Sequence, residues 1–129
     1  MTDTMTDDDK KRLAQDPDGL LTYEYIANHI GTPELDIDWL EANLERVDPQ
    51  GQFTGSAARY LHAIDPEAFA PAISRLIAAT IDRDREHRYL PALIQGIWGE
   101  DYEARAAELS ATSDNFRRIY KRLNPTSIL

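Results

Sequence analysis

The apolar residues of this chain recur at helical spacing along most of its length. Positions i, i+3, i+4 and i+7 are apolar in four separate segments, which begin at Tyr23, Ala57, Leu90 and Phe116. Looser stripes of the same period begin at Ile37 and at Ile73. Strict two-residue alternation, which is typical of a half-buried strand, is almost absent. The pattern predicts an all-α fold, a single compact multi-helix bundle of about six to eight short helices.

Proline and capping residues mark where these helices start and stop. Pro71 and Pro91 would each interrupt a continuous helix, so we expect helices to begin near Ala70 and near Leu90. Ser113 is a good N-cap for the last helix because its hydroxyl can accept a backbone N–H hydrogen bond.

The length of the chain favours one domain over residues 1–129, with the polar residues 1–9 frayed. The acids at positions 7–9 would also suit the first turn of a short helix. The Asp-Pro pairs at positions 16, 48 and 65 fit no solenoid period. A compact bundle is therefore favoured over a repeat array, although the second half could stack as helical hairpins.

The excess negative charge lies entirely in the first part of the chain. Residues 1–51 carry 13 Asp and Glu against 4 Lys and Arg, whereas residues 52–129 carry 10 of each. The chain has no cysteine, which excludes disulfides and thiolate metal sites. Neither a basic, apolar leader nor an apolar run long enough for a membrane span is present. We expect a cytoplasmic protein, and the preference for Arg over Lys suggests a bacterial one.

The segment Tyr23–Leu40, within a hairpin near residues 20–47, resembles a helix-turn-helix. Ala27 supplies the small residue where the helices cross, and Gly31 supplies the turn. Pro33 suits the start of the second helix. Many ordinary helical hairpins satisfy this pattern, so it indicates two packed helices more firmly than it indicates DNA binding.

Acidic residues follow one stripe of the second helix of this hairpin. They are Glu34, Asp38, Glu41 and Glu45. Such a stripe repels phosphates, so it argues against nucleic acid at this hairpin and favours docking of a basic protein surface. Trp39 lies beside the stripe and is the aromatic residue we expect to anchor such an interface. The alternative is a solvated face of two core helices.

The last helix carries a basic patch formed by Arg117, Arg118, Lys121 and Arg122. Cations near a helix C-terminus interact favourably with the helix dipole, which is a sufficient explanation of the patch. It could also meet the acidic stripe of a second copy, or contact nucleic acid weakly and in a salt-sensitive way.

No catalytic constellation is apparent, and we expect no cofactor and no metal. The three histidines lie far apart and form no metal-binding pair. The acids between Asp82 and Arg88 alternate with arginines, as in a solvated connector whose charges neutralise one another. Gly96, in the most apolar helix, allows a close approach by another group, and a small-ligand pocket near Gly96 and Trp98 is the third possibility.

The leading expectation is a helical module that binds a protein partner, or a second copy of itself, through the acidic N-terminal surface. The first alternative is a nucleic-acid-binding transcriptional regulator. The second is a small-ligand binder or an enzyme without a recognisable catalytic motif.

Overall fold

The computed structural model describes residues 5–32 and 35–126, and it confirms the all-α, multi-helix bundle. No strand occurs in these two ranges. The helices are α1 (Asp7–Ala14), α2 (Leu20–His29), α3 (Ile37–Val47), α4 (Gln52–Ile64), α5 (Ala70–Arg83), α6 (Leu90–Trp98), α7 (Ala106–Thr112) and α8 (Asp114–Leu123).

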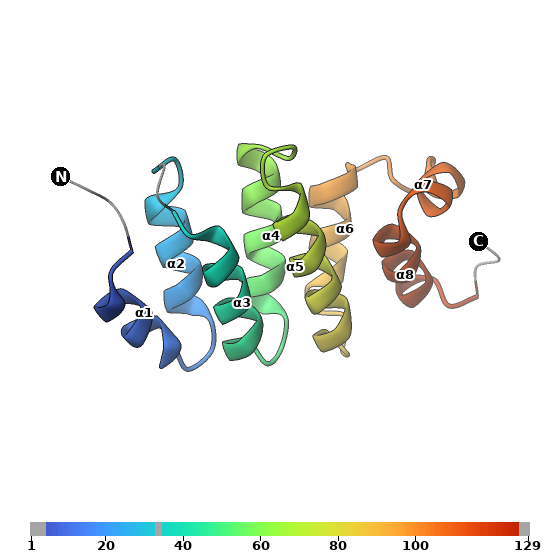
Figure 1. Cartoon of the computed structure of the whole chain (residues 1–129). Helices are drawn as coiled ribbons and strands as arrows, with labels where there is room; N and C mark the ends of the chain where they lie inside the picture. The colour runs from blue at the N-terminus through green and yellow to red at the C-terminus, as the bar shows by residue number, and fades with distance from the viewer. Residues whose placement is uncertain (1–4, 33–34, 127–129) are drawn as a thin grey trace.

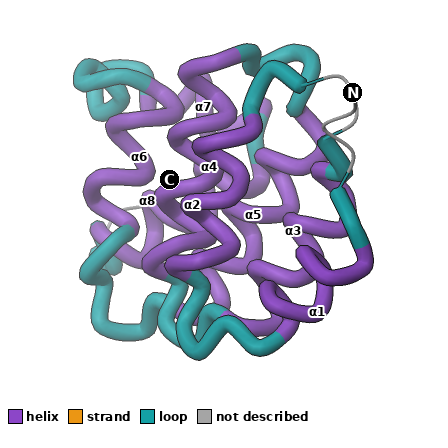
Figure 2. The backbone as a smooth tube through the Cα atoms, turned by 90° about the vertical axis from the view of Figure 1, so that its left-hand side faces the viewer, coloured by secondary structure: helices purple, strands orange, loops and turns teal. Residues whose placement is uncertain are grey.

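The helices stand side by side in two layers (Figure 1). One layer holds α1, α3 and α5, and the other holds α2, α4 and α6, as the view along the row shows (Figure 2). The α7–α8 pair closes the row, with α8 packed on α5 and α6. The loops α1–α2, α3–α4 and α5–α6 therefore lie along one edge of the molecule, each joining the two layers.

The apolar stripes read from the sequence face the space between the layers. Fully buried side chains come from both layers and from α8; examples are Leu13, Ile26, Leu61, Leu93 and Phe116. Burying one such side chain contributes roughly 1.5–3 kcal/mol relative to leaving it exposed. The stripes thus determine which face of each helix is covered.

The helix boundaries confirm the sequence-based expectations about proline and capping. α5 begins at Ala70 and α6 at Leu90, each with proline in its first turn. Ser113 Oγ accepts a hydrogen bond from the backbone N–H of Phe116 at 3.1 Å and caps α8. At the other end, the three acids at 7–9 form the first turn of α1, and residues 1–4 lie outside the described residues.

Three buried aspartates close the three loops on the common edge in the same way. They are Asp16, Asp48 and Asp84, and each follows the first helix of a pair. Asp48 accepts hydrogen bonds from the backbone N–H groups of Gln50, Gly51, Phe53 and Thr54 at 2.8–3.1 Å. Asp84 likewise accepts from the N–H groups of Arg88, Tyr89 and Leu90.

The third residue after each aspartate has a positive φ. It is Gly19 in the first loop, Gly51 in the second and His87 in the third, with φ of 108°, 85° and 57°. The aspartates are 32 and 36 residues apart, so three helical hairpins repeat along the chain. The Asp-Pro pairs did not reveal this repeat, because the third loop contains neither proline nor glycine. Asp84, expected in a solvated connector, is 2% exposed.

Asp16 makes the stability of the protein dependent on pH. Burial of its carboxylate opposes ionisation, but hydrogen bonds from Thr22, Gly19 and Asp18 outweigh this effect and lower the pKa of Asp16. A lowered folded-state pKa stabilises the fold above the unfolded-state value of about 4, and this stabilisation is lost as the pH falls through the folded-state pKa.

We therefore expect urea denaturation to show that the free energy of unfolding falls on acidification. Asp16→Asn should be less stable at neutral pH and should show a shallower fall in acid, because position 16 no longer titrates. Parallel pH profiles for the two proteins would contradict this role of Asp16.

The helix-turn-helix detail of the predicted hairpin is not confirmed. α2 ends at His29 and α3 begins at Ile37, so the connection runs over residues 30–36, whereas a helix-turn-helix has a turn of about three or four residues. Asp36 is the N-cap of α3, and its Oδ1 accepts from the N–H of Trp39 at 3.1 Å. Pro33 and Glu34 lie outside the described residues.

Candidate functional site

The acidic stripe of α3 faces α5 over part of its length. Glu41 is only 4% exposed, and its Oε1 accepts a hydrogen bond from Arg75 Nε at 2.6 Å. The second contact of Arg75 joins its Nη2 to Asp38 Oδ1 at 3.3 Å. The hydrogen bond and the charge of Glu41 raise the pKa of Arg75. Glu41 therefore helps to join two helices and does not lie on a free surface.

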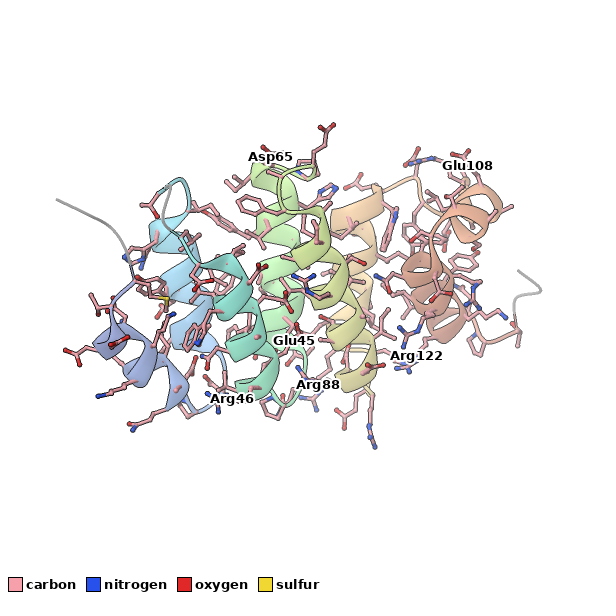
Figure 3. All side chains as sticks on the ribbon, in the orientation of Figure 1. Glu45, Arg46, Asp65, Arg88, Glu108 and Arg122 are labelled. Atoms are coloured by element: carbon pink, nitrogen blue, oxygen red, sulfur yellow. The ribbon has the colours of Figure 1, made fainter. Side chains whose placement is uncertain are left out.

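The remaining acids of the stripe differ in their surroundings. The side chain of Asp38 is 84% exposed. Glu45 is half-buried, and its Oε2 is shielded from solvent without a hydrogen-bond partner in the described part of the chain (Figure 3). Glu34 lies outside the described residues. The stripe is consequently not one continuous solvated face, and Asp38 is its exposed member.

Trp39 lies at a shallow pocket between α1 and α3. The pocket has a volume of about 320 Å³ and is lined by Ala14, Trp39, Ala42, Asn43 and Arg46. The indole is half-buried and packs on the hydrophobic core, while Lys10 Nζ lies 5.5 Å from the centroid of its ring. A partly covered aromatic residue in a pocket is the arrangement expected of an interface anchor.

Hydrogen bonds hold the wall of this pocket in place. Arg46 Nη2 donates to the carbonyl of Ala14 at 2.8 Å and to Asn43 Oδ1 at 2.7 Å. Asn43 Nδ2 donates to the carbonyl of Leu13 at 2.9 Å and to Thr22 Oγ1 at 3.0 Å. This network ties α1 and α2 to α3, so the pocket is formed before any partner binds.

The basic patch of α8 is largely engaged within the chain. Arg117 pairs with Asp114, and Arg118 pairs with Asp82 at 2.9 Å. Arg122 Nη1 donates to the carbonyl of Ile81 at 2.5 Å (Figure 3). Lys121 is exposed. Arg118 and Arg122 thus hold α8 against α5, while the hydrogen bond of Arg122 to a carbonyl leaves its positive charge unneutralised.

The surroundings of Gly96 and Trp98 are filled by side chains. A Cβ at position 96 would lie 2.7 Å from Arg59 Cδ, so the Arg59 side chain takes the space that the glycine leaves. The Trp98 ring meets the Phe116 ring edge-on, with centroids 5.3 Å apart. The close approach expected at Gly96 is therefore made by a side chain of α4.

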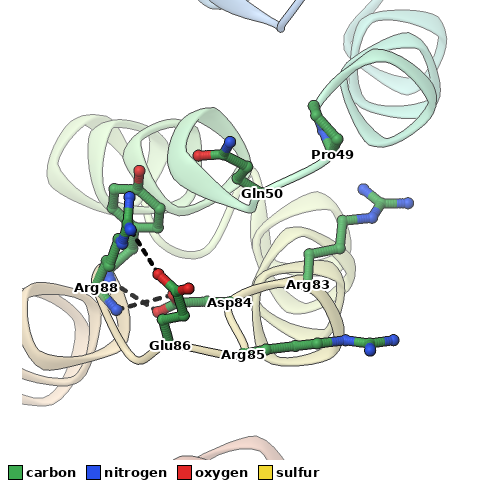
Figure 4. A pocket seen from close by; sticks show the side chains of 8 residues that line it. Pro49, Gln50, Arg83, Asp84, Arg85, Glu86 and Arg88 are labelled. Atoms are coloured by element: carbon green, nitrogen blue, oxygen red, sulfur yellow. Dashed lines mark hydrogen bonds and ion pairs between the residues drawn. The ribbon is translucent and has the colours of Figure 1, made fainter.

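Sequence reasoning missed a basic pocket beside the third aspartate loop (Figure 4). Its volume is about 250 Å³, and its lining residues are Pro49, Gln50, Arg83, Asp84, Arg85, Glu86, Arg88 and Tyr89. The one available signal was three arginines within six residues of an otherwise acidic chain. The sequence predicts a self-neutralising connector at these arginines, because the burial of Asp84 is not apparent from it.

Two further features, a group of metal-ligating side chains and a helix that could span a membrane, are absent from the residues that the structure describes. They contain no group of three or more His, Asp or Glu side chains arranged to hold a metal ion. None of their helices is both long and apolar enough to cross a membrane. Comparison with protein-family models, with curated proteins and with solved structures found no match to this chain.

Proposed function

We propose that this chain is a cytoplasmic protein-binding module, and that its partner docks on the surface formed by α1 and α3. The observation that carries the proposal is the position of Trp39, half-buried in a preformed pocket between these two helices. Tryptophan is enriched among the residues that dominate binding energy, and such residues cluster where water is excluded.

Apolar and polar side chains both contribute to the pocket, and one of the polar ones, Asn43, is buried. Trp39, Ala42 and Ala14 supply apolar area, while Lys10 and Arg46 lie beside them. Apolar area with polar groups around it is common at protein interfaces. The pocket therefore suits an apolar side chain that projects from the surface of the partner.

The groups beside the pocket itself, Lys10 and Arg46, are basic, but the net charge of this end of the molecule is acidic and indicates which surface would approach it. Asp38 and the first-turn acids Asp7 and Asp8 are exposed on α3 and α1. Residues 1–51 carry all of the net charge of −9. A partner with a basic surface would be drawn to this end of the molecule and held in a preferred orientation.

Filling the pocket tests the proposal without removing core packing. Ala42 is exposed and lines the pocket, so Ala42→Arg should block it while preserving the helix. Tagged protein is to be incubated with native lysate at low salt, and the retained proteins identified by mass spectrometry. We expect one stoichiometric partner, with binding about thirtyfold weaker for Trp39→Ala and similarly weakened for Ala42→Arg.

Two control variants separate the pocket from general effects. Ala92→Arg places the same side chain at an exposed position of α6, and Glu100→Lys matches the charge change of Asp38→Lys at a remote site. Both controls should retain the partner, whereas Asp38→Lys should weaken it. Retention by Ala42→Arg, or an empty bait, would overturn the proposal. Glu41 is unsuitable for this experiment, because reversing a buried, paired carboxylate tests folding.

A further inference from the structure

The basic pocket on the common edge lies between the α3–α4 loop and the α5–α6 loop. Pro49 and Gln50 come from the α3–α4 loop. Arg83 is the last residue of α5, and Arg85 comes from the α5–α6 loop. Figure 4 shows the Arg83 and Arg85 side chains extending toward the same side of the pocket. The pocket is separate from the α1–α3 surface, and it shares no lining residue with the Trp39 pocket.

The acids in the pocket are already occupied. Both oxygens of Asp84 accept backbone N–H groups of the following turn at 2.7–2.8 Å. Glu86 Oε2 pairs with Arg88 Nη2 at 2.5 Å. Within the described part of the chain, these contacts leave no acid in the pocket paired with Arg83 or Arg85.

Arg83 is the more constrained of these two arginines. Its Nη1 is shielded from solvent, and it has no hydrogen-bond acceptor among the described residues. A charged donor without an acceptor is costly, so an anion in the pocket that reached the Arg83 guanidinium would gain a strong, charge-assisted hydrogen bond. Arg85, two residues further along, is exposed and available to the same ligand.

We infer that this pocket binds the phosphate group of a small organic phosphate, held by Arg83 and Arg85. Two guanidinium groups match the double negative charge of a phosphate monoester. A ligand with a single carboxylate would neutralise only one of the two guanidinium groups. The planar donors of arginine suit the paired oxygens of such a group. Tyr89, half-buried, and Pro49 supply apolar surface for the organic part of the ligand.

Because the protein is acidic overall, we expect an anion to bind only where basic side chains cluster. A chain with a net charge of −9 repels anions in general, so anion binding has to arise from a local cluster. Interactions between exposed charges are largely screened beyond about 8 Å at physiological salt, so acids farther than this from the pocket have little effect on a bound anion. Binding should therefore persist in moderate salt.

The test is a titration of the full chain with inorganic phosphate and, separately, with phenyl phosphate. Isothermal calorimetry gives the affinity, and NMR reports the side-chain Nε–H resonances of the arginines. We expect saturable shifts at Arg83 and Arg85, and binding at least about tenfold weaker in Arg83→Gln/Arg85→Gln. Tighter binding of phenyl phosphate would name an organic phosphate as the ligand, whereas equal affinity would assign the site to the free ion and overturn that part of the inference.

A matched variant distinguishes the pocket from bulk charge. Lys11→Gln/Arg12→Gln removes the same two charges from exposed positions of α1 and should bind as the unaltered chain does. Equal losses in the two double variants, or shifts that do not saturate, would overturn the inference. If Arg83→Gln unfolds the protein, Arg85→Gln alone serves, since Arg85 is exposed. Neither result bears on the proposed role of the Trp39 pocket, which is tested separately.

Discussion

Replacement of Asp48 by alanine is expected to lower the free energy of unfolding by about 3–5 kcal/mol. The Asp48 carboxylate is 2% exposed and accepts four backbone N–H groups at the start of α4. Leaving a buried donor without an acceptor costs roughly 1–3 kcal/mol, and these four costs overlap because the turn can partly relax. The loss is a large fraction of the stability of a typical domain.

Urea denaturation followed by circular dichroism measures this effect. Asp48→Asn is the informative companion, because it keeps the size of the side chain and one of its acceptor oxygens. It should lose less stability than Asp48→Ala. A loss below about 1 kcal/mol for the alanine variant would show that the loop does not depend on its carboxylate.

Phe116→Ala is the second change with a large expected effect, a loss of about 3–5 kcal/mol. Phe116 is fully buried on α8 and contacts a cluster of aromatic rings. The ring centroids of Trp98, Tyr120 and Tyr102 lie 5.3, 5.6 and 6.2 Å from its own. Truncation would leave a cavity between α8 and the rest of the bundle.

Thermal and urea denaturation check this prediction, and near-ultraviolet circular dichroism reports the packing of the aromatic rings. Phe116→Leu fills most of the cavity and should cost markedly less than Phe116→Ala. Equal losses would show that the volume of the side chain is not what joins α8 to the bundle. An unchanged near-ultraviolet spectrum in the alanine variant would also contradict the packing argument.

The helices and most of their ends were predictable because their determinants are local. The stripe from Leu90 to Ile97 shows which face of α6 is buried, and proline near Ala70 and Leu90 fixes where two helices begin. Ser113 caps α8 through a residue three positions away. Such signals lie within a few residues of the feature that they determine.

The surroundings of the charged residues could not be predicted, because they depend on contacts between residues that are far apart in the sequence. The spacing of Asp38 and Glu41 places them on one face of α3, but it does not show that Arg75 meets them from α5. The burial of Asp84 was not predictable, because its hydrogen-bond partners are backbone groups and no pattern of side chains reveals them. The basic pocket was missed for the same reason. The roles of Glu34, Asp38, Trp39, Glu41 and Glu45 in partner binding stay predictions.

The three aspartate-closed hairpins also bear on how rapidly the chain can fold. Among consecutive helices α4 and α5 pack most closely, although they belong to different hairpins, and the two layers grow by adding each hairpin to its neighbour. The entropy lost in closing such short loops is small, and proteins rich in local contacts fold fastest at a given stability. We expect ordering to begin where consecutive helices pack closely, at α4 and α5, and to spread from there to the neighbouring helices. The architecture therefore points to the centre of the row, and not to either end, as the first part of the chain to become ordered.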